Sequence, residues 1–194
     1  ILRTDQRGKS EDRPGFAHLL HPAYTAGVGL GIDFGTTRTV AAHADRGNYP
    51  IVSFETESGD MVEWFPSVVA ERDGELRFGW SAIAAASDPS FTQARSFKRL
   101  LAGHEARANG EITIGSTRIG IVDLIERFFV ALAEALRTRS NLPRSLKKAD
   151  RFDAVVATPA NAFCTQRFVT LDAFRRAGFD VSAMLNEPSA AGFE

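Results

Sequence analysis

Cysteine is almost absent from this chain, in which Cys164 is the only one among 194 residues. A single thiol cannot form an intrachain disulfide, and the low usage agrees with a reducing compartment. Cys164 and the four histidines also lack the spacing of metal ligands. We therefore expect a cytoplasmic protein without a zinc centre.

Long hydrophobic runs and an excess of one charge are missing too. No apolar run approaches the roughly 18 residues that cross a bilayer, and the beginning, ILRTDQRGKSEDRPG, lacks the apolar segment of a secretory signal. The formal net charge of -1 gives no general attraction to nucleic acid or to an anionic membrane. We expect neither as a partner.

One group of basic residues stands out against this balanced background. Its members are Arg137, Arg139, Arg144, Lys147, Lys148 and Arg151. Cations at a helix end and in the loop after it are usually solvated, and no aromatic residues alternate with these to stack on bases. The group therefore does not change the expectation on nucleic acid.

The composition that is present, 44% hydrophobic and 24% charged residues, is typical of a soluble globular protein. Residues 1–26 mix charge with glycine and proline and begin at isoleucine, which predicts a poorly ordered extension. A helical pattern begins after Pro188 and stops without a capping residue at Glu194. We interpret the chain as a fragment.

Apolar and β-branched runs at residues 28–34 and 39–44 flank a short polar turn and predict an antiparallel hairpin. Residues 50–55 predict a third strand. The irregular stretch 56–118 predicts an inserted subdomain with two hairpins, one of which turns at Asp73-Gly74.

Longer elements follow the insertion. Apolar residues at helical spacing predict a helix over 121–139, and a second helix is expected over 165–177, ended by Gly178. Strands are predicted at FDAVVATP and VSAMLNEP.

The order of these elements predicts an α/β fold, in which a mixed five-stranded sheet carries helices on its faces. Residues 27–55 and 119–194 would form this layer, and 56–118 a smaller inserted α+β subdomain.

The turn after the first strand carries the clearest chemistry. Gly35 permits a tight bend, so that backbone N–H groups and the hydroxyls of Thr36 and Thr37 converge on a volume suited to phosphate. Asp33 would repel a bare phosphate, and its carboxylate makes more sense holding a hydrated Mg²⁺ that bridges to the anion. The same letters also fit an ordinary capped hairpin turn.

A second carboxylate, Glu187, stands at the end of a predicted strand, directly before Pro188. Ligands of open sheets lie beyond the carboxyl ends of strands. Asp33 and Glu187 are therefore predicted to face one cleft and to serve magnesium binding and water positioning.

These motifs resemble, in order and rough spacing, the nucleotide-binding domain of the DnaK-like heat shock protein 70 chaperones, over about Gly29 to Glu194. The segments that carry the resemblance are GIDFGTTRTVAA, FPSVVA, FKRLLAG, VVATPANAFCTQR and LNEPSAAGFE. The resemblance implies the first lobe of an actin-like ATPase with a ribonuclease H-like sheet. The second lobe and the peptide-binding domain would lie beyond this chain.

The resemblance also implies ligands and roles. ATP or ADP would bind with Mg²⁺, which Asp33 orients through water, and the phosphates would be contacted by the turn. The residues of that turn are Gly35, Thr36, Thr37 and Arg38. Glu187 would position the attacking water, and unfolded peptide or a co-chaperone would bind through regions outside this chain.

Pro159 and Arg167 resemble the family's pair that relays the nucleotide state to the interdomain linker. Two simpler interpretations stay open: Pro159 ends a strand, and Arg167 is a solvated residue in the first turn of a helix.

One departure from the family concerns catalysis. Ile83 stands where the family has its catalytic lysine, and an aliphatic side chain cannot stabilise charge on a transferred phosphoryl group. The departure at Ile83 resembles the divergent YegD-like branch of the family. Lys98 is a candidate replacement, although a lysine on an amphipathic stretch is more often solvated.

Three functions remain as hypotheses: an ATP-hydrolysing chaperone, a nucleotide-sensing scaffold with little hydrolysis, and a sugar-kinase-like phosphotransferase that rests on the first turn alone.

Overall fold

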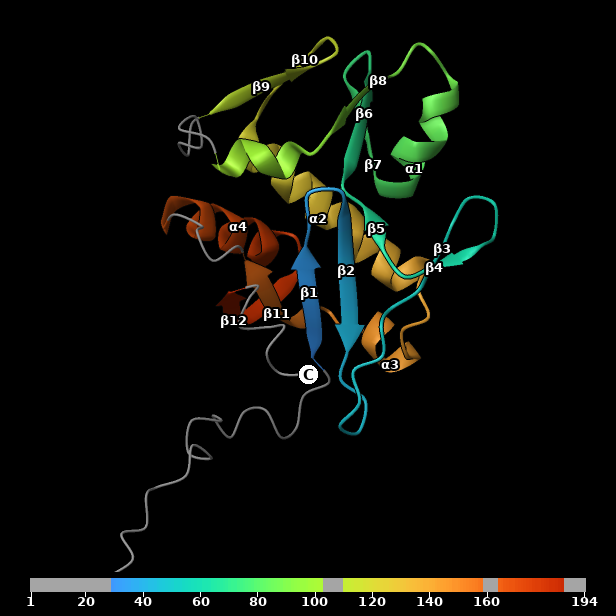
Figure 1. The fold of residues 1–194 in the computed structure, drawn as a ribbon, viewed down its shortest axis with the longest axis vertical. Coiled ribbons are helices and arrows are strands. Elements are labelled where there is room, and N and C mark those ends of the chain that lie inside the picture. The colour runs from blue at the N-terminus through green and yellow to red at the C-terminus, as the bar shows by residue number, and fades with distance from the viewer. Residues whose placement is uncertain (1–28, 103–109, 159–163, 187–194) are drawn as a thin grey trace, which may run out of the picture.

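The computed structural model describes residues 29–102, 110–158 and 164–186 (Figure 1). The extension expected over residues 1–26 and the helix expected after Pro188 lie outside the described residues. Within them, the chain forms a five-stranded mixed sheet with helices packed on it and a three-stranded sheet beside it.

The five-stranded sheet runs in the order β12-β11-β1-β2-β5. Strand β1 (Leu30–Phe34) pairs in parallel with β11 (Phe152–Thr158) and antiparallel with β2 (Arg38–His43). Strand β12 (Phe179–Asn186) lies parallel to β11, and β5 (Phe65–Pro66) completes the antiparallel edge. The mixed sheet expected from the sequence is confirmed, with β1 at its centre.

The strand predicted over residues 50–55 is wrong in part. Ile51 makes only an isolated bridge to β2, and β3 (Phe54–Glu55) pairs instead with β4 (Met61–Val62). Phe54 is fully buried, with its ring centroid 5.8 Å from that of Phe65. The first residues of the segment stay beside β2, where the N–H of Val52 donates to the carbonyl of Ala41 (2.7 Å), while β5 pairs with the other end of β2.

The core lies between the sheet and two helices. Strand alternation buries Leu30, Ile32 and Phe34 of β1 on one face, against which α2 (Ile121–Thr138) packs (Figure 1). The apolar residues at helical spacing on this helix are buried: Ile121, Leu124, Ile125, Phe128, Phe129, Leu132 and Leu136. The predicted amphipathic helix is therefore confirmed.

The second helix, α4 (Cys164–Arg176), packs against α2 and β12. The ring of Phe174 on α4 stacks on Phe129 of α2, with centroids 3.6 Å apart. Gly178 follows the helix with a φ of 93°, the left-handed conformation that commonly ends helices, as predicted. A short helix, α3 (Arg144–Lys147), lies between α2 and β11.

Beside this layer, three strands form a smaller sheet in the order β7-β6-β8. Strands β6 (Val68–Arg72) and β7 (Glu75–Phe78) are joined at Asp73-Gly74, where both residues have a positive φ. The hairpin turn predicted at this dipeptide is confirmed. Strand β8 (Thr92–Arg95) pairs antiparallel with β6.

Two helical segments and a second hairpin lie around the smaller sheet. Helix α1 (Gly79–Ala84) runs directly into a 3-10 turn, η3 (Ala85–Ser87). A longer 3-10 segment, η4 (Phe97–Ala102), follows β8. Strands β9 (Glu111–Ile114) and β10 (Thr117–Gly120) form the second predicted hairpin, which leads into α2.

Glu71 of β6 connects the β6–β7 hairpin to the β9–β10 hairpin through hydrogen bonds. Its carboxylate is buried, with 2% of the residue exposed, and it accepts hydrogen bonds from the backbone N–H of Gly74 (2.9 Å) and from the hydroxyl of Thr117 (2.7 Å). Ser116 donates both its backbone N–H (3.0 Å) and its hydroxyl (2.8 Å). These donors, with Gly74 first, lower the pKa of Glu71 to about 2.

We predict that Glu71→Gln destabilises the protein at neutral pH, because an amide cannot accept all the hydrogen bonds that the carboxylate accepts. The pKa is lowered from 4.5, so the carboxylate stabilises the fold fully above pH 4.5 and loses this effect as the pH falls towards 2. Thermal unfolding should show a melting temperature lower by on the order of 5 °C at pH 7, and the difference should narrow below pH 4.5. Glu63→Gln, at an exposed position, is the control. Equal melting temperatures for Glu71→Gln and the unmodified protein at pH 7 would contradict this prediction.

Candidate functional site

The parallel strands β1, β11 and β12 end at one edge of the main sheet (Figure 1). Asp33 is in register with Ala157, Ala157 with Leu185, and Thr158 with Asn186. The last residues of the three strands therefore lie side by side. This edge is where ligands bind in open α/β sheets.

Asp33 is exposed at this edge. Its neighbours Ile32 and Phe34 are buried, so the alternation of the strand directs Asp33 to the opposite face from the core. Its carboxylate is therefore accessible to solvent and to a hydrated ion.

The turn after Asp33 is tight and fixed. A Cβ atom on Gly35 would lie 2.2 Å from the carbonyl oxygen of Arg38, a contact that excludes any side chain there. The hydroxyl of Ser67 donates to the carbonyl of Gly35 (2.9 Å), and its backbone N–H donates to the carbonyl of Thr37 (3.0 Å). The predicted need for glycine in this turn has a clear steric basis.

The other predicted turn residues differ in their surroundings. Thr36 is half-buried and Thr37 is exposed, so both hydroxyls lie at or near the surface beside Asp33. The guanidinium of Arg38 lies 4.6 Å from the centroid of Trp64, whose ring in turn packs against Trp80 (4.7 Å). Both tryptophans therefore take part in packing beside the turn.

Arg167 connects α4 to the end of β12. Its Nη1 donates to Oδ1 of Asn186 (2.9 Å) and its Nη2 to the carbonyl of Met184 (3.4 Å). Arg167 is therefore more than a solvated residue at a helix start. Glu187, which follows Asn186, and Pro159 lie outside the described residues, so the predicted meeting of Asp33 with Glu187 stays a prediction.

Ile83 and Lys98 both pack against apolar side chains, in different parts of the fold. Ile83 is half-buried on α1 and packs with an apolar cluster. The buried members of that cluster are Val68, Ala70, Ala82 and Ala85. Lys98 is only 8% exposed, and its Nζ lies 5.3 Å from the ring centroid of Phe34. The interpretation of Lys98 as a solvated residue is wrong, because η4 packs it against the end of β1.

A small recess, with a volume of about 10 Å³ that holds about one water molecule, lies at the same edge of the sheet. It is lined by Phe34, Lys98, Ala157, Thr158, Gln166, Arg167 and Thr170. The sequence did not predict this recess, because η4, β11 and α4 all contribute to it from distant parts of the chain.

The donors at this edge are suited to a hydrated cation. Within residues 29–102, 110–158 and 164–186, no three His, Cys, Asp or Glu side chains come together as metal ligands. A single exposed carboxylate at Asp33, next to two hydroxyls, fits Mg²⁺, which usually keeps several waters. It does not fit an ion enclosed by protein ligands.

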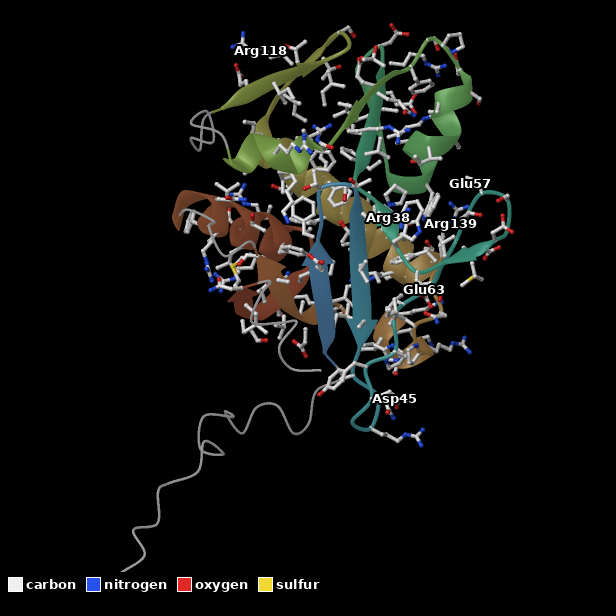
Figure 2. All side chains as sticks on the ribbon, viewed as in Figure 1. Arg38, Asp45, Glu57, Glu63, Arg118 and Arg139 are labelled. Carbon is white, nitrogen blue, oxygen red and sulfur yellow. The ribbon has the colours of Figure 1, made fainter. Side chains whose placement is uncertain are left out.

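Several residues of the basic group have structural contacts. Arg137 lies 4.4 Å from the ring centroid of Phe152, and Arg151 Nε donates to Asp180 (2.6 Å). Arg139 forms a bidentate ion pair with Glu57, and its hydrogen bonds to that carboxylate raise the pKa of the arginine (Figure 2). These cations join elements of the fold and are not merely solvated.

No helix among the described residues has the length and apolar character to cross a membrane. No family model matches the chain.

Curated relatives are found over most of the chain's length. A chaperone protein HscA homolog of Burkholderia multivorans is 34% identical over 188 residues, which cover 92% of this chain and 29% of that protein. Proteins of the same name from Burkholderia mallei (strain SAVP1) and Burkholderia pseudomallei (strain K96243) show the same identity and coverage. The chain thus spans less than a third of these relatives. With the motifs at the strand ends, this similarity identifies the chain as a member of the heat shock protein 70 family of chaperones.

Proposed function

We propose that this chain is part of an ATP-binding chaperone, in which Mg-ATP binding and hydrolysis are coupled to closure of two lobes and to binding of a client or partner. One observation carries the proposal: the exposed carboxylate of Asp33 stands directly before a turn that admits only glycine at Gly35. Membership of the chaperone family supports it.

In this proposal, Asp33 holds Mg²⁺ through water, and the ion neutralises the phosphates of the bound nucleotide. The hydroxyls of Thr36 and Thr37 and the backbone N–H groups of the turn bind phosphate oxygens. Ser67, between β5 and β6, holds the turn in place through its two hydrogen bonds. Glu187, directly after the end of β12, would position the attacking water.

The proposed relay rests on Arg167. Its hydrogen bond to Asn186 connects α4 to the residue before Glu187, which gives a physical route from the nucleotide to a helix on the sheet. Pro159 follows β11 and is proposed as the second member. Unfolded peptide or a co-chaperone would then bind through parts of the protein outside this chain, and we propose that it acts in the cytoplasm.

A second candidate function is a nucleotide-sensing scaffold that binds ATP with little hydrolysis. The environment of Ile83 favours it, since this side chain packs among aliphatic residues and offers no charge to a phosphoryl group.

We predict that Asp33→Asn weakens binding of ATP in the presence of Mg²⁺ by about tenfold or more, because the amide loses the charge that holds the hydrated ion. Calorimetric titration with Mg-ATP, and with ATP in excess EDTA, measures this. The affinity without Mg²⁺ should change little. Asp45→Asn is the control, since Asp45 is exposed at the other end of β2 (Figure 2). Equal Mg-ATP affinity of Asp33→Asn and the unmodified protein would count against the site.

The two candidate functions differ in a single-turnover measurement. The protein that carries this chain is mixed in excess with Mg-ATP, and release of phosphate is compared with that of Asp33→Asn. Phosphate release above the variant supports the ATPase, whereas binding without such release supports the scaffold.

We predict that Gly35→Ala destabilises the protein by about 1–3 kcal/mol and impairs nucleotide binding, because the new methyl group would displace the backbone at Arg38. Gly31→Ala, within β1, is the matched control, since no atom lies within 4 Å of a Cβ there. Urea unfolding and titration with Mg-ATP test both variants. The steric argument fails if the two variants behave alike.

A further inference from the structure

Two buried hydroxyl groups lie beside the turn between β1 and β2. Thr39 is fully buried, and Ser67 is 2% exposed. Their side-chain oxygens are 3.1 Å apart, and the hydroxyl of Ser67 lies 2.9 Å from the carbonyl oxygen of Gly35. Burial of a hydroxyl without a hydrogen bond costs free energy, and these two contacts offset that cost.

The chemistry of the three groups fixes the direction of both hydrogen bonds. A carbonyl oxygen can only accept, so Ser67 uses its single hydroxyl hydrogen on Gly35. Ser67 then has no hydrogen left for Thr39, and Thr39 is therefore the donor between the two hydroxyls. Donation by Thr39 polarises the hydroxyl of Ser67 and strengthens its bond to Gly35. The result is a one-way chain of hydrogen bonds from Thr39 through Ser67 to the turn.

This chain sets the orientation of the peptide bond between Gly35 and Thr36. In a trans peptide bond the C=O and the N–H point in opposite directions, and no peptide bond among the described residues is cis. Because Ser67 holds the carbonyl of Gly35, the N–H of Thr36 points away from the buried hydroxyls.

The direction away from these hydroxyls is also the direction away from the core. Thr39 is in register with Phe34, and both side chains are buried on the core face of the main sheet. Asp33 points to the opposite face. The N–H of Thr36 is therefore directed to the side of the sheet on which Asp33 is exposed.

Glycine makes a restraint on this peptide bond necessary. Gly35 has no Cβ, so the peptide bond that follows it can rotate at little steric cost. Among the residues that the structure describes, the hydroxyl of Ser67 is the only donor to the carbonyl of Gly35. Without it, that carbonyl would turn towards solvent, and the N–H of Thr36 would turn inwards.

The turn offers free donors for an anion. Within the described residues, neither the N–H of Thr36 nor that of Thr37 donates to a protein acceptor. Thr36 is half-buried and Thr37 is exposed, so water or a ligand can reach both. Successive N–H groups of a turn that converge in this way bind anions.

We propose that Thr39 and Ser67 are positioning residues that hold the N–H of Thr36 ready for a phosphate oxygen of the bound nucleotide. The inference rests on the proposed nucleotide binding and adds the buried groups that orient the turn. Ser67 contacts no ligand and acts through the carbonyl of Gly35, and Thr39 acts through Ser67.

Ser67→Ala tests this, because it removes the hydroxyl and keeps the backbone N–H that donates to Thr37. We expect titration of the protein that carries this chain to show binding of Mg-ATP and of pyrophosphate weakened by about tenfold. Thr39→Val, which keeps the shape of the side chain, should weaken binding by a smaller factor and have no further effect in the Ser67→Ala background. Thr39→Ser, which keeps the hydroxyl, should retain most of the affinity.

Ser140→Ala is the matched control. Ser140 is also buried, at 7% exposed, and its hydroxyl donates to the carbonyl of Leu136 (2.6 Å) in another part of the fold. The two alanine variants make the same chemical change, and both should lower the melting temperature. Only Ser67→Ala should lower the affinity for pyrophosphate and Mg-ATP, which separates positioning of the turn from a loss of stability.

Equal Mg-ATP affinity of Ser67→Ala and the unmodified protein would overturn the inference and leave the nucleotide proposal standing. An equal loss of affinity in Ser140→Ala would overturn it too, as would a Thr39→Val effect that is as large in the Ser67→Ala background as alone. If the unmodified protein binds pyrophosphate in a manner that depends on Ser67 but binds no nucleotide, the positioning role stands and the nucleotide proposal fails. Absence of both kinds of binding contradicts both.

Should Ser67→Ala fail to fold, as judged by circular dichroism, the unmodified protein labelled with ¹⁵N at threonine provides the readout. The amide resonance of Thr36, assigned with Thr36→Ser, should shift on addition of Mg-ATP and of pyrophosphate but not of adenosine. An unchanged Thr36 resonance at saturating ATP would rule out the proposed contact.

Discussion

The packing of Phe34 against α2 is the contact on which the candidate site depends. Its ring centroid lies 4.9 Å from that of Phe129 and 5.5 Å from that of Phe128. Since side chains alternate along a strand, burial of Phe34 directs Asp33 to the other face and exposes its carboxylate. The hydrophobic core thus sets the orientation of the acid and the point at which the chain must turn.

A second constraint comes from Ser67, which is buried between two sheets. It lies after the last residue of β5 in the main sheet and before the first residue of β6 in the smaller one. Its hydrogen bonds to the carbonyls of Gly35 and Thr37 connect that junction to the turn. A shift of the smaller sheet relative to the main one would therefore act directly on the proposed phosphate-binding backbone.

Local pattern was enough for the elements that bury a regular face. The hairpin of β1 and β2, the helix α2 and the turn at Asp73-Gly74 follow from periodicity and turn chemistry alone. Contacts between segments far apart in the sequence could not be predicted from local pattern. Strand β5 has two residues, too few for a pattern, and Lys98 is buried over the ring of Phe34, which lies far away in the sequence. The pairing of Arg167 with Asn186 depends on how α4 packs on the sheet.

The aliphatic side chain of Ile83 fits the apolar surroundings in which it packs. The side chain packs with Val68, Ala70, Ala82 and Ala85, so a lysine at this position would bury its stem among aliphatic groups and have to extend its ammonium beyond them. Lys98, in contrast, reaches the end of β1 from a turn anchored by Phe97. A cation at the strand ends and an aliphatic residue on α1 are therefore compatible within one fold. An aliphatic side chain on α1 offers no charge to a phosphoryl group, so the proposed binding of nucleotide at the turn after β1 and the proposed hydrolysis are separate properties of the protein.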